Sequence, residues 1–172
     1  MKLIVQLLGI IILIPLVAIG TLRYQHQDAD GPSLLFPGGQ LVSGPLYTGP
    51  EPNWSFTENI QTIELQLTEP TSSRFVWVLP VDGRLFVASG YMNSVLGRLW
   101  KHWAIQADEG NGEAVIRIND TRYNRQIVRI HQGNILDGVA TVMTNKYGSP
   151  TTRQEIEAGN TWVFELTARG RQ

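Results

Sequence analysis

A tight turn between two apolar segments constrains the fold of this chain more than any other feature. Asp82 and Gly83 stand between the apolar residues 75–79 and a second apolar run, residues 85–88. An Asp-Gly pair flanked in this way is a strong β-hairpin signal, because both turn positions need a positive φ. The sequence therefore predicts two adjacent antiparallel strands, with a continuous apolar run in the first that is typical of burial on both faces.

Four further segments have the patterning of β-strands. Residues 63–67 and 161–168 alternate apolar with polar side chains, and residues 114–118 and 122–130 flank an Asn-Asp turn at 119–120. Residues 69–73 are expected to form a loop. Six short antiparallel strands predict a mainly β fold, a small six-stranded barrel whose closure leaves no free strand edge.

One or two helices are expected beside this barrel. After the hairpin, Asn93 or Ser94 can cap a helix, and residues 135–147 have a weaker helical period. The first helix has apolar residues at i, i+3, i+4 and i+7 spacing, which predicts that they face the core. These residues are Leu96, Leu99, Trp100, Trp103 and Ala107.

The N-terminus carries a long apolar run. Residues 3–22 contain one strongly polar side chain, Gln6, and about 20 apolar residues match the hydrocarbon thickness of a bilayer. We interpret residues 1–23 as a signal anchor, a single transmembrane helix in the inner (cytoplasmic) membrane with the rest of the chain in the periplasm or exterior. Two alternatives stay open: a signal peptide cleaved near Ala18-Ile19-Gly20, which would give a secreted form, and a buried core helix.

The remaining chain has the length of one domain. Residues 24–52 are rich in Gly, Pro, Gln and Asp and are predicted to be a linker that becomes an ordered strap near residues 33–36. Residues 53–172 then form the barrel domain. The absence of cysteine excludes disulfides, thiolate nucleophiles and cysteine metal sites.

The net charge is close to zero, but the charged residues are unevenly distributed along the chain. The net charge of −1 gives no electrostatic case for a nucleic-acid partner. Residues 28–82 hold seven acids and one cation, Arg74, whereas residues 84–129 hold seven Arg or Lys and four acids. A locally basic, Arg-rich segment suits phosphate or carboxylate binding, and it equally suits a solvated face.

Several segments together resemble the split β-barrel flavin-binding superfamily, which includes pyridoxamine 5′-phosphate oxidase and the deazaflavin-dependent nitroreductases. They are "DGRLFVASG", the tryptophan-containing helix, "AVIRINDTRYNRQIVRI", "NKYG" and "WVFELTAR". The resemblance covers residues 61–169. It implies a split barrel, a homodimer with two ligand sites at the interface, FMN or a deazaflavin as cofactor, and an oxidoreductase activity.

The resemblance also places a cofactor phosphate at the end of the second hairpin strand and the start of the following helix. The matching residues are Ser89, Asn93, Ser94, Arg98 and Lys101. Guanidinium, ammonium and hydroxyl donors suit a phosphate, although a solvated helix face with a polar cap has the same composition. Tyr91, in a polar context, is the best aromatic candidate for stacking on a ligand.

Other chemistry has less support. Trp77, Trp100 and Trp103 have the spacing of core residues, and His102 and His131 are expected at the surface. There is no metal-binding motif, so no metal is expected, and no hydrolase motif. Two functional hypotheses follow: a membrane-tethered flavin- or deazaflavin-dependent oxidoreductase, and a non-catalytic periplasmic barrel that binds a ligand or a protein.

Overall fold

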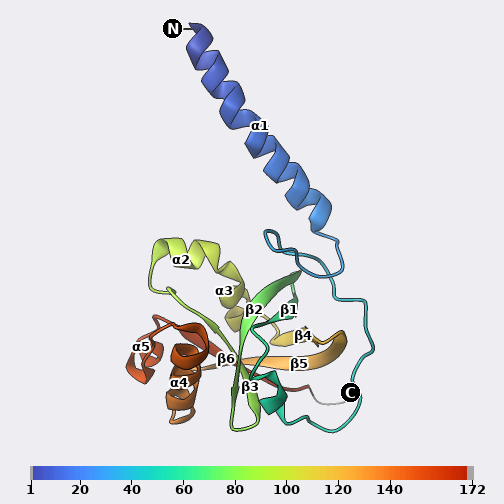
Figure 1. Cartoon of the computed structure of the whole chain (residues 1–172), viewed down its shortest axis with the longest axis vertical. Helices are drawn as coiled ribbons and strands as arrows, with labels where there is room; N and C mark the ends of the chain where they lie inside the picture. Colours follow the sequence, from blue (N-terminus) through green and yellow to red (C-terminus); the bar gives the residue numbers. More distant parts are fainter. Residues whose placement is uncertain (1, 170–172) are drawn as a thin grey trace.

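A computed structural model describes residues 2–169, apart from the side chains of residues 2, 3, 5 and 8. The outermost residues of the predicted segments, Met1 and 170–172, lie outside the described residues. A long helix, α1 (Lys2–His26), stands clear of the barrel (Figure 1). It continues through Pro15 and ends beyond Arg23, where the predicted anchor segment ends.

The barrel is closed and antiparallel, which confirms the predicted fold class. Its strands are β1 (Thr62–Thr68), β2 (Thr71–Val81), β3 (Arg84–Ser89), β4 (Glu113–Ile118), β5 (Thr121–Ile130) and β6 (Trp162–Ala168). They follow one another around the barrel in the order β1-β2-β3-β6-β5-β4, and β4 pairs with β1. The predicted turns have the positive φ that they require, 51° at Asp82 and 47° at Asn119.

Strand β2 departs from the prediction in two ways. It begins at Thr71 inside the predicted loop, because its backbone finds partners there: the ladder with β1 continues to Thr68, and Gly38 exchanges two hydrogen bonds with Ser73 (3.0 and 2.8 Å). The prediction that β2 is buried on both faces is wrong. Phe75 and Trp77 point to the outer face and are partly exposed.

The predicted tryptophan helix is two helices with different surroundings. α2 (Val95–Trp100) and α3 (His102–Glu109) are separated at Lys101, whose φ and ψ are −106° and 36°. α3 buries Trp103 and Ala107, as predicted. None of the α2 residues is buried.

The prediction that Leu96, Leu99 and Trp100 face the core is therefore wrong, and Trp100 is 87% exposed. The helical period continues in the sequence across Lys101, but the change of backbone direction there carries α2 away from the barrel. A periodic pattern shows which residues share a helix face only while the helix is continuous.

Helix α4 (Ile135–Tyr147) confirms the weaker helical prediction and packs its apolar side against β2. Tyr147 accepts a hydrogen bond from the Val78 amide (3.0 Å) and stacks on Trp77 with ring centroids 4.4 Å apart. Two short helices were not predicted, α5 (Arg153–Glu157) and the 3-10 helix η1 (Trp54–Thr57). Both are too short to show a hydrophobic period, so the expected one or two helices are too few.

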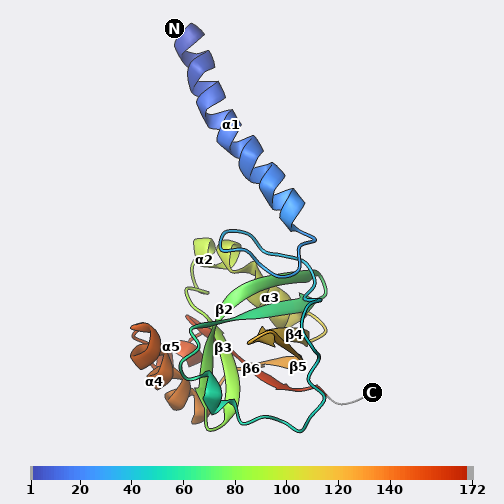
Figure 2. The same cartoon turned by 45° about the vertical axis from the view of Figure 1, so that its right-hand side comes forward.

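The segment between α1 and η1 is a strap fixed along the outside of the barrel (Figure 2). We use "strap" for residues 27–52. It forms isolated β-bridges with the barrel, from Gly38 to Ser73 in β2 and from Leu46 to Arg122 in β5. The Arg122 side chain also donates to the carbonyls of Leu41 (3.0 Å) and Gly44 (2.9 Å). Leu41 is fully buried, and its amide donates to Gln66 (2.8 Å). The predicted linker is thus an ordered part of the domain.

Charged contacts reinforce the strap. Asp30 accepts from the amides of Val42 (2.8 Å) and Ser43 (3.2 Å) and from Arg117 (2.9 Å), which also pairs with Glu64. The carboxylate of Asp30 therefore joins two parts of the strap to strands β1 and β4.

Candidate functional site

The six residues predicted to hold a cofactor lie on one continuous segment that leaves β3 and passes through α2. Ser89 ends β3; it is buried, and its hydroxyl lies 3.3 Å from the sulfur of Met92. Tyr91 follows with a φ of 64° and an exposed ring. The structure therefore brings the residues together along the chain, and their contacts show what each one does there.

The polar side chains of Asn93 and Ser94 shape this loop. The Asn93 amide donates to Asn160 (2.7 Å), which attaches the loop to the segment before β6. The Ser94 hydroxyl donates to the Tyr91 carbonyl (2.9 Å) and accepts from the Gly97 amide (2.9 Å), so it is the N-cap of α2. A Cβ at Gly97 would lie 1.9 Å from the Tyr91 carbonyl oxygen, so only glycine fits this turn.

Arg98 and Lys101 are the two cations of the segment. Arg98 donates through Nε to the Met92 carbonyl (2.8 Å), and the Lys101 ammonium lies 5.9 Å from the centre of the Tyr91 ring. Burial lowers the pKa of Lys101. Within residues 2–169, neither cation forms an ion pair with a carboxylate.

The other cations of the basic segment are engaged elsewhere. Arg84 pairs with Glu165, Arg117 with Asp30 and Glu64, Arg125 with Glu51, and Arg129 with Asp108. Arg122 holds strap carbonyls. Asp30, Glu51 and Glu64 belong to the acidic residues 28–82. The acidic and basic segments of the sequence are therefore largely paired with each other inside the folded domain.

Strand β5 shows how a basic strand pairs with acidic residues from elsewhere in the chain. Its alternating Arg and Tyr side chains predict a face that is wet or in contact with a ligand. Arg125 is instead almost fully buried, where it donates to the Leu166 carbonyl and to both carboxylate oxygens of Glu51 (2.8 and 2.6 Å). The strap covers this face, so the alternation indicates an intramolecular contact.

Two surface grooves lie outside the predicted segment. One, of about 350 Å³, runs between the end of α1 and the start of β2. The other, of about 380 Å³, lies between α4 and α5. It is lined mainly by hydroxyl and amide side chains, and those of Asn145 and Gln154 form no hydrogen bond within the described part of the chain. None of the six predicted residues lines either groove.

A sequence signal for the second groove exists. Thr152 and Glu155 form a capping box, with the Thr152 hydroxyl accepting from the Glu155 amide (3.3 Å) and the Glu155 carboxylate accepting from the Thr152 amide (2.9 Å). The Thr-x-x-Glu spacing is a recognised mark of a helix start. It would have located α5, and with it one wall of the groove.

Among the residues that the structure describes, no group of three or more His, Asp or Glu side chains is placed to hold a metal ion. His102 and His131 are exposed, as predicted.

No protein-family model, no curated protein and no solved structure matches this chain. The class is therefore defined by the structure alone: a closed six-stranded antiparallel barrel that carries an N-terminal helix long and apolar enough to span a membrane.

Proposed function

We propose that this protein is a membrane-tethered, non-catalytic binding module. In this proposal α1 is a single-pass anchor in the cytoplasmic membrane and the barrel lies in the periplasm or exterior. The window Gly9–His26 has a mean hydropathy of 1.4, and none of it is buried against the barrel. A helix of 25 residues is about 37 Å long, enough to cross a hydrocarbon core of about 30 Å.

The strap is the observation that carries the proposal. Its buried Leu41, its sheet bridges and its ion pairs run from the end of α1 to the first residues of the barrel domain. A barrel that only needed to be kept near a membrane would be served by a flexible linker. An ordered strap supports a role in which the barrel presents one particular surface away from the membrane.

The groove between α4 and α5 is the surface that we assign to the ligand. The two helices that line it, α4 and α5, lie together on one side of the barrel, in the half of the domain away from α1 (Figure 1). Amide side chains such as Asn145 and Gln154 offer a donor and an acceptor each, as a polypeptide main chain does. We therefore propose a neutral, hydrogen-bonding ligand, such as an extended peptide segment of a partner protein.

A cofactor titration tests the non-catalytic assignment. The full-length protein, purified in lipid nanodiscs, is expected to be colourless and to bind neither FMN nor a deazaflavin, because Ser89 and Ser94 use their hydroxyls within their own loop and Asn93 donates to Asn160. The measurement is the visible absorbance spectrum followed by titration with each cofactor. Saturable binding of either one would contradict the proposal.

The flavin- or deazaflavin-dependent oxidoreductase is the second candidate, because Arg98 and Lys101 have no carboxylate partner in the described structure and can bind a phosphate. If a cofactor binds, Arg98→Ala and Lys101→Ala are each expected to weaken it by about 1–3 kcal/mol, the value of a hydrogen bond to a charged group. Arg153→Ala, in the lining of the groove between α4 and α5 and outside the cofactor segment, is the matched control. The homodimer implied by the resemblance belongs to this second candidate.

A further inference from the structure

We propose that α2 and the turn at residues 33–36 of the strap form a membrane-docking surface, which rests the barrel on the lipid bilayer beside the proposed anchor α1. This inference depends on the proposed role of α1 as a membrane anchor. It assigns the bilayer surface itself as the partner of residues that the cofactor hypothesis leaves unexplained.

Helix α2 has an apolar surface without a partner in the described structure. Val95, Leu96, Leu99 and Trp100 are between 78% and 87% exposed, and they are consecutive or one turn apart. Contiguous exposed apolar side chains on a soluble domain mark a contact with a protein or a membrane.

A second apolar projection comes from the strap. Leu34 and Leu35 are 92% and 81% exposed. They form the tip of a tight turn in which the Ser33 amide donates to the Phe36 carbonyl (3.0 Å) and the Phe36 amide donates to the Ser33 hydroxyl (3.0 Å). The turn is held by its own hydrogen bonds, so the two leucines are presented to solvent by an ordered backbone.

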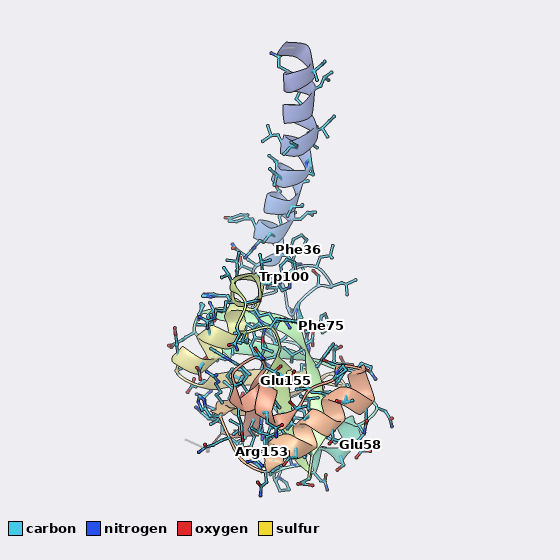
Figure 3. All side chains as sticks on the ribbon, turned by 90° about the vertical axis from the view of Figure 1, so that its left-hand side faces the viewer. Phe36, Glu58, Phe75, Trp100, Arg153 and Glu155 are labelled. Atoms are coloured by element: carbon cyan, nitrogen blue, oxygen red, sulfur yellow. The ribbon has the colours of Figure 1, made fainter. Side chains whose placement is uncertain are left out.

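Both projections lie at the end of the domain from which α1 leaves (Figures 1 and 2). In the view from the side, Trp100 and Phe36 both lie at the end of the domain that faces α1 (Figure 3). Strand pairing explains this placement. β2 begins next to α1, since Thr71 and Ser72 line a groove with Arg23 and Tyr24, and antiparallel β3 leads the chain back toward the same end.

A chain of contacts links the start of α3 to the same place. The Arg74 guanidinium donates to the Ser72 hydroxyl and lies 5.9 Å from the centre of the Trp103 ring. Trp103 belongs to the first turn of α3, which follows α2 after Lys101. A bilayer spanned by α1 therefore has its surface at the end of the domain that carries α2.

The chemistry of this end favours a bilayer over a protein or a second copy of the chain. Trp100, Tyr91 and Tyr24 are exposed aromatic residues, and tryptophan and tyrosine are enriched at membrane interfaces. Arg98 and Lys101 have no carboxylate partner, and such cations beside an apolar helix face attract anionic headgroups. The phosphate that the family resemblance places at this segment is, in this proposal, that of a phospholipid.

The absence of cysteine makes a direct test possible, because each introduced cysteine is a single labelling site. The full-length protein is reconstituted in vesicles of three parts phosphatidylcholine to one part phosphatidylglycerol. Nitroxide labels are placed at Leu35→Cys or Leu99→Cys, with Leu13→Cys in α1 and Asn145→Cys on α4 as lipid and water references. All four side chains are exposed, so none is required for folding.

The measured quantity is the accessibility of each nitroxide to oxygen relative to a water-soluble nickel chelate. Labels at 35 and 99 are expected to show a ratio at least threefold above that of the label at 145 and below that of the label at 13, as for a contact at headgroup depth. Ratios at 35 and 99 equal to the ratio at 145 would overturn the docking surface. Low accessibility to both reagents with spin-spin broadening would assign α2 to a second copy, and low accessibility without broadening to a protein contact.

The label at Leu13 separates this inference from the proposed anchor. If the oxygen-to-nickel ratio at 13 is well above that at 145 but the ratios at 35 and 99 equal that at 145, docking is refuted and the proposed anchor stands. If the ratio at 13 equals that at 145, the anchor is refuted. The ratios at 35 and 99 then still decide whether α2 binds lipid by itself. The variant Arg98→Gln/Lys101→Gln is expected to lower the ratio at 99 in these vesicles and not in vesicles of phosphatidylcholine alone.

Discussion

At the scale of single residues, the charged side chains of this protein mainly hold its parts together. Arginines on the barrel strands, Arg117 and Arg125, reach acids of the strap, Asp30 and Glu51. The sequence shows an acidic half and a basic half, and the structure shows that they are one another's partners. Exposed ion pairs contribute little each, so the effect here comes from the buried arginines and from several pairs along one segment.

Asp30 gives a residue-scale prediction. Hydrogen bonding with Ser43, together with the hydrogen bonds of Val42 and Arg117 and the charge of Arg117, outweighs the opposing effect of burial and lowers the pKa of Asp30 to about 2. Because the folded-state pKa lies below the ordinary aspartate value of 3.8, Asp30 contributes its stability above about pH 4 and loses it as the pH falls through about 2. The measurement is the carboxyl carbon shift of Asp30 followed by NMR against pH. A midpoint near 3.8 would show that the strap contacts are absent in solution.

At the scale of elements, the strap behaves as part of the barrel. Leu41 is 1% exposed, and its amide is satisfied by the buried Gln66. Nothing in the Gly- and Pro-rich composition of residues 24–52 distinguishes Leu41 from Leu34, which is exposed. The difference arises from contacts with residues far along the chain.

Leu41→Ala is therefore expected to lower the free energy of unfolding by about 2–5 kcal/mol, the usual cost of removing a buried leucine side chain. Leu34→Ala is the matched control and is expected to change it by less than about 0.5 kcal/mol. Both are measured by urea unfolding of the full-length protein in detergent micelles, followed by tryptophan fluorescence. Equal effects of the two substitutions would mean that the strap is not part of the folded unit.

The same elements show what the sequence can predict. The hairpin turns at Asp82-Gly83 and Asn119-Asp120, the strand periods and α4 depend on local patterns, and the structure confirms them. The exposure of α2 depends on one change of backbone direction at Lys101, which the unbroken helical period around it conceals. The six predicted site residues do lie together, because they are neighbours in the chain, but the partners of Asn93, Ala158 and Asn160, come from a distant segment that no local pattern indicates.

At the scale of the whole molecule, the strap connects two parts that the sequence describes only separately. The apolar helix and the barrel are each predicted from local patterns, whereas their relative placement depends on contacts of residues 27–52 with β1, β2, β4 and β5. The roles proposed for the ligand groove, the docking surface and α1 as an anchor all depend on this placement.

The distance between α1 and the barrel tests this account most directly. Nitroxide labels at Leu22→Cys and Asn145→Cys in one full-length chain, reconstituted in nanodiscs, report that distance by pulsed electron paramagnetic resonance. An ordered strap predicts a single narrow distance distribution, which broadens when Leu41→Ala is added. A broad distribution in the protein without Leu41→Ala would contradict the central claim, because it would show that residues 27–52 are a flexible linker and that the barrel has no fixed orientation to the membrane.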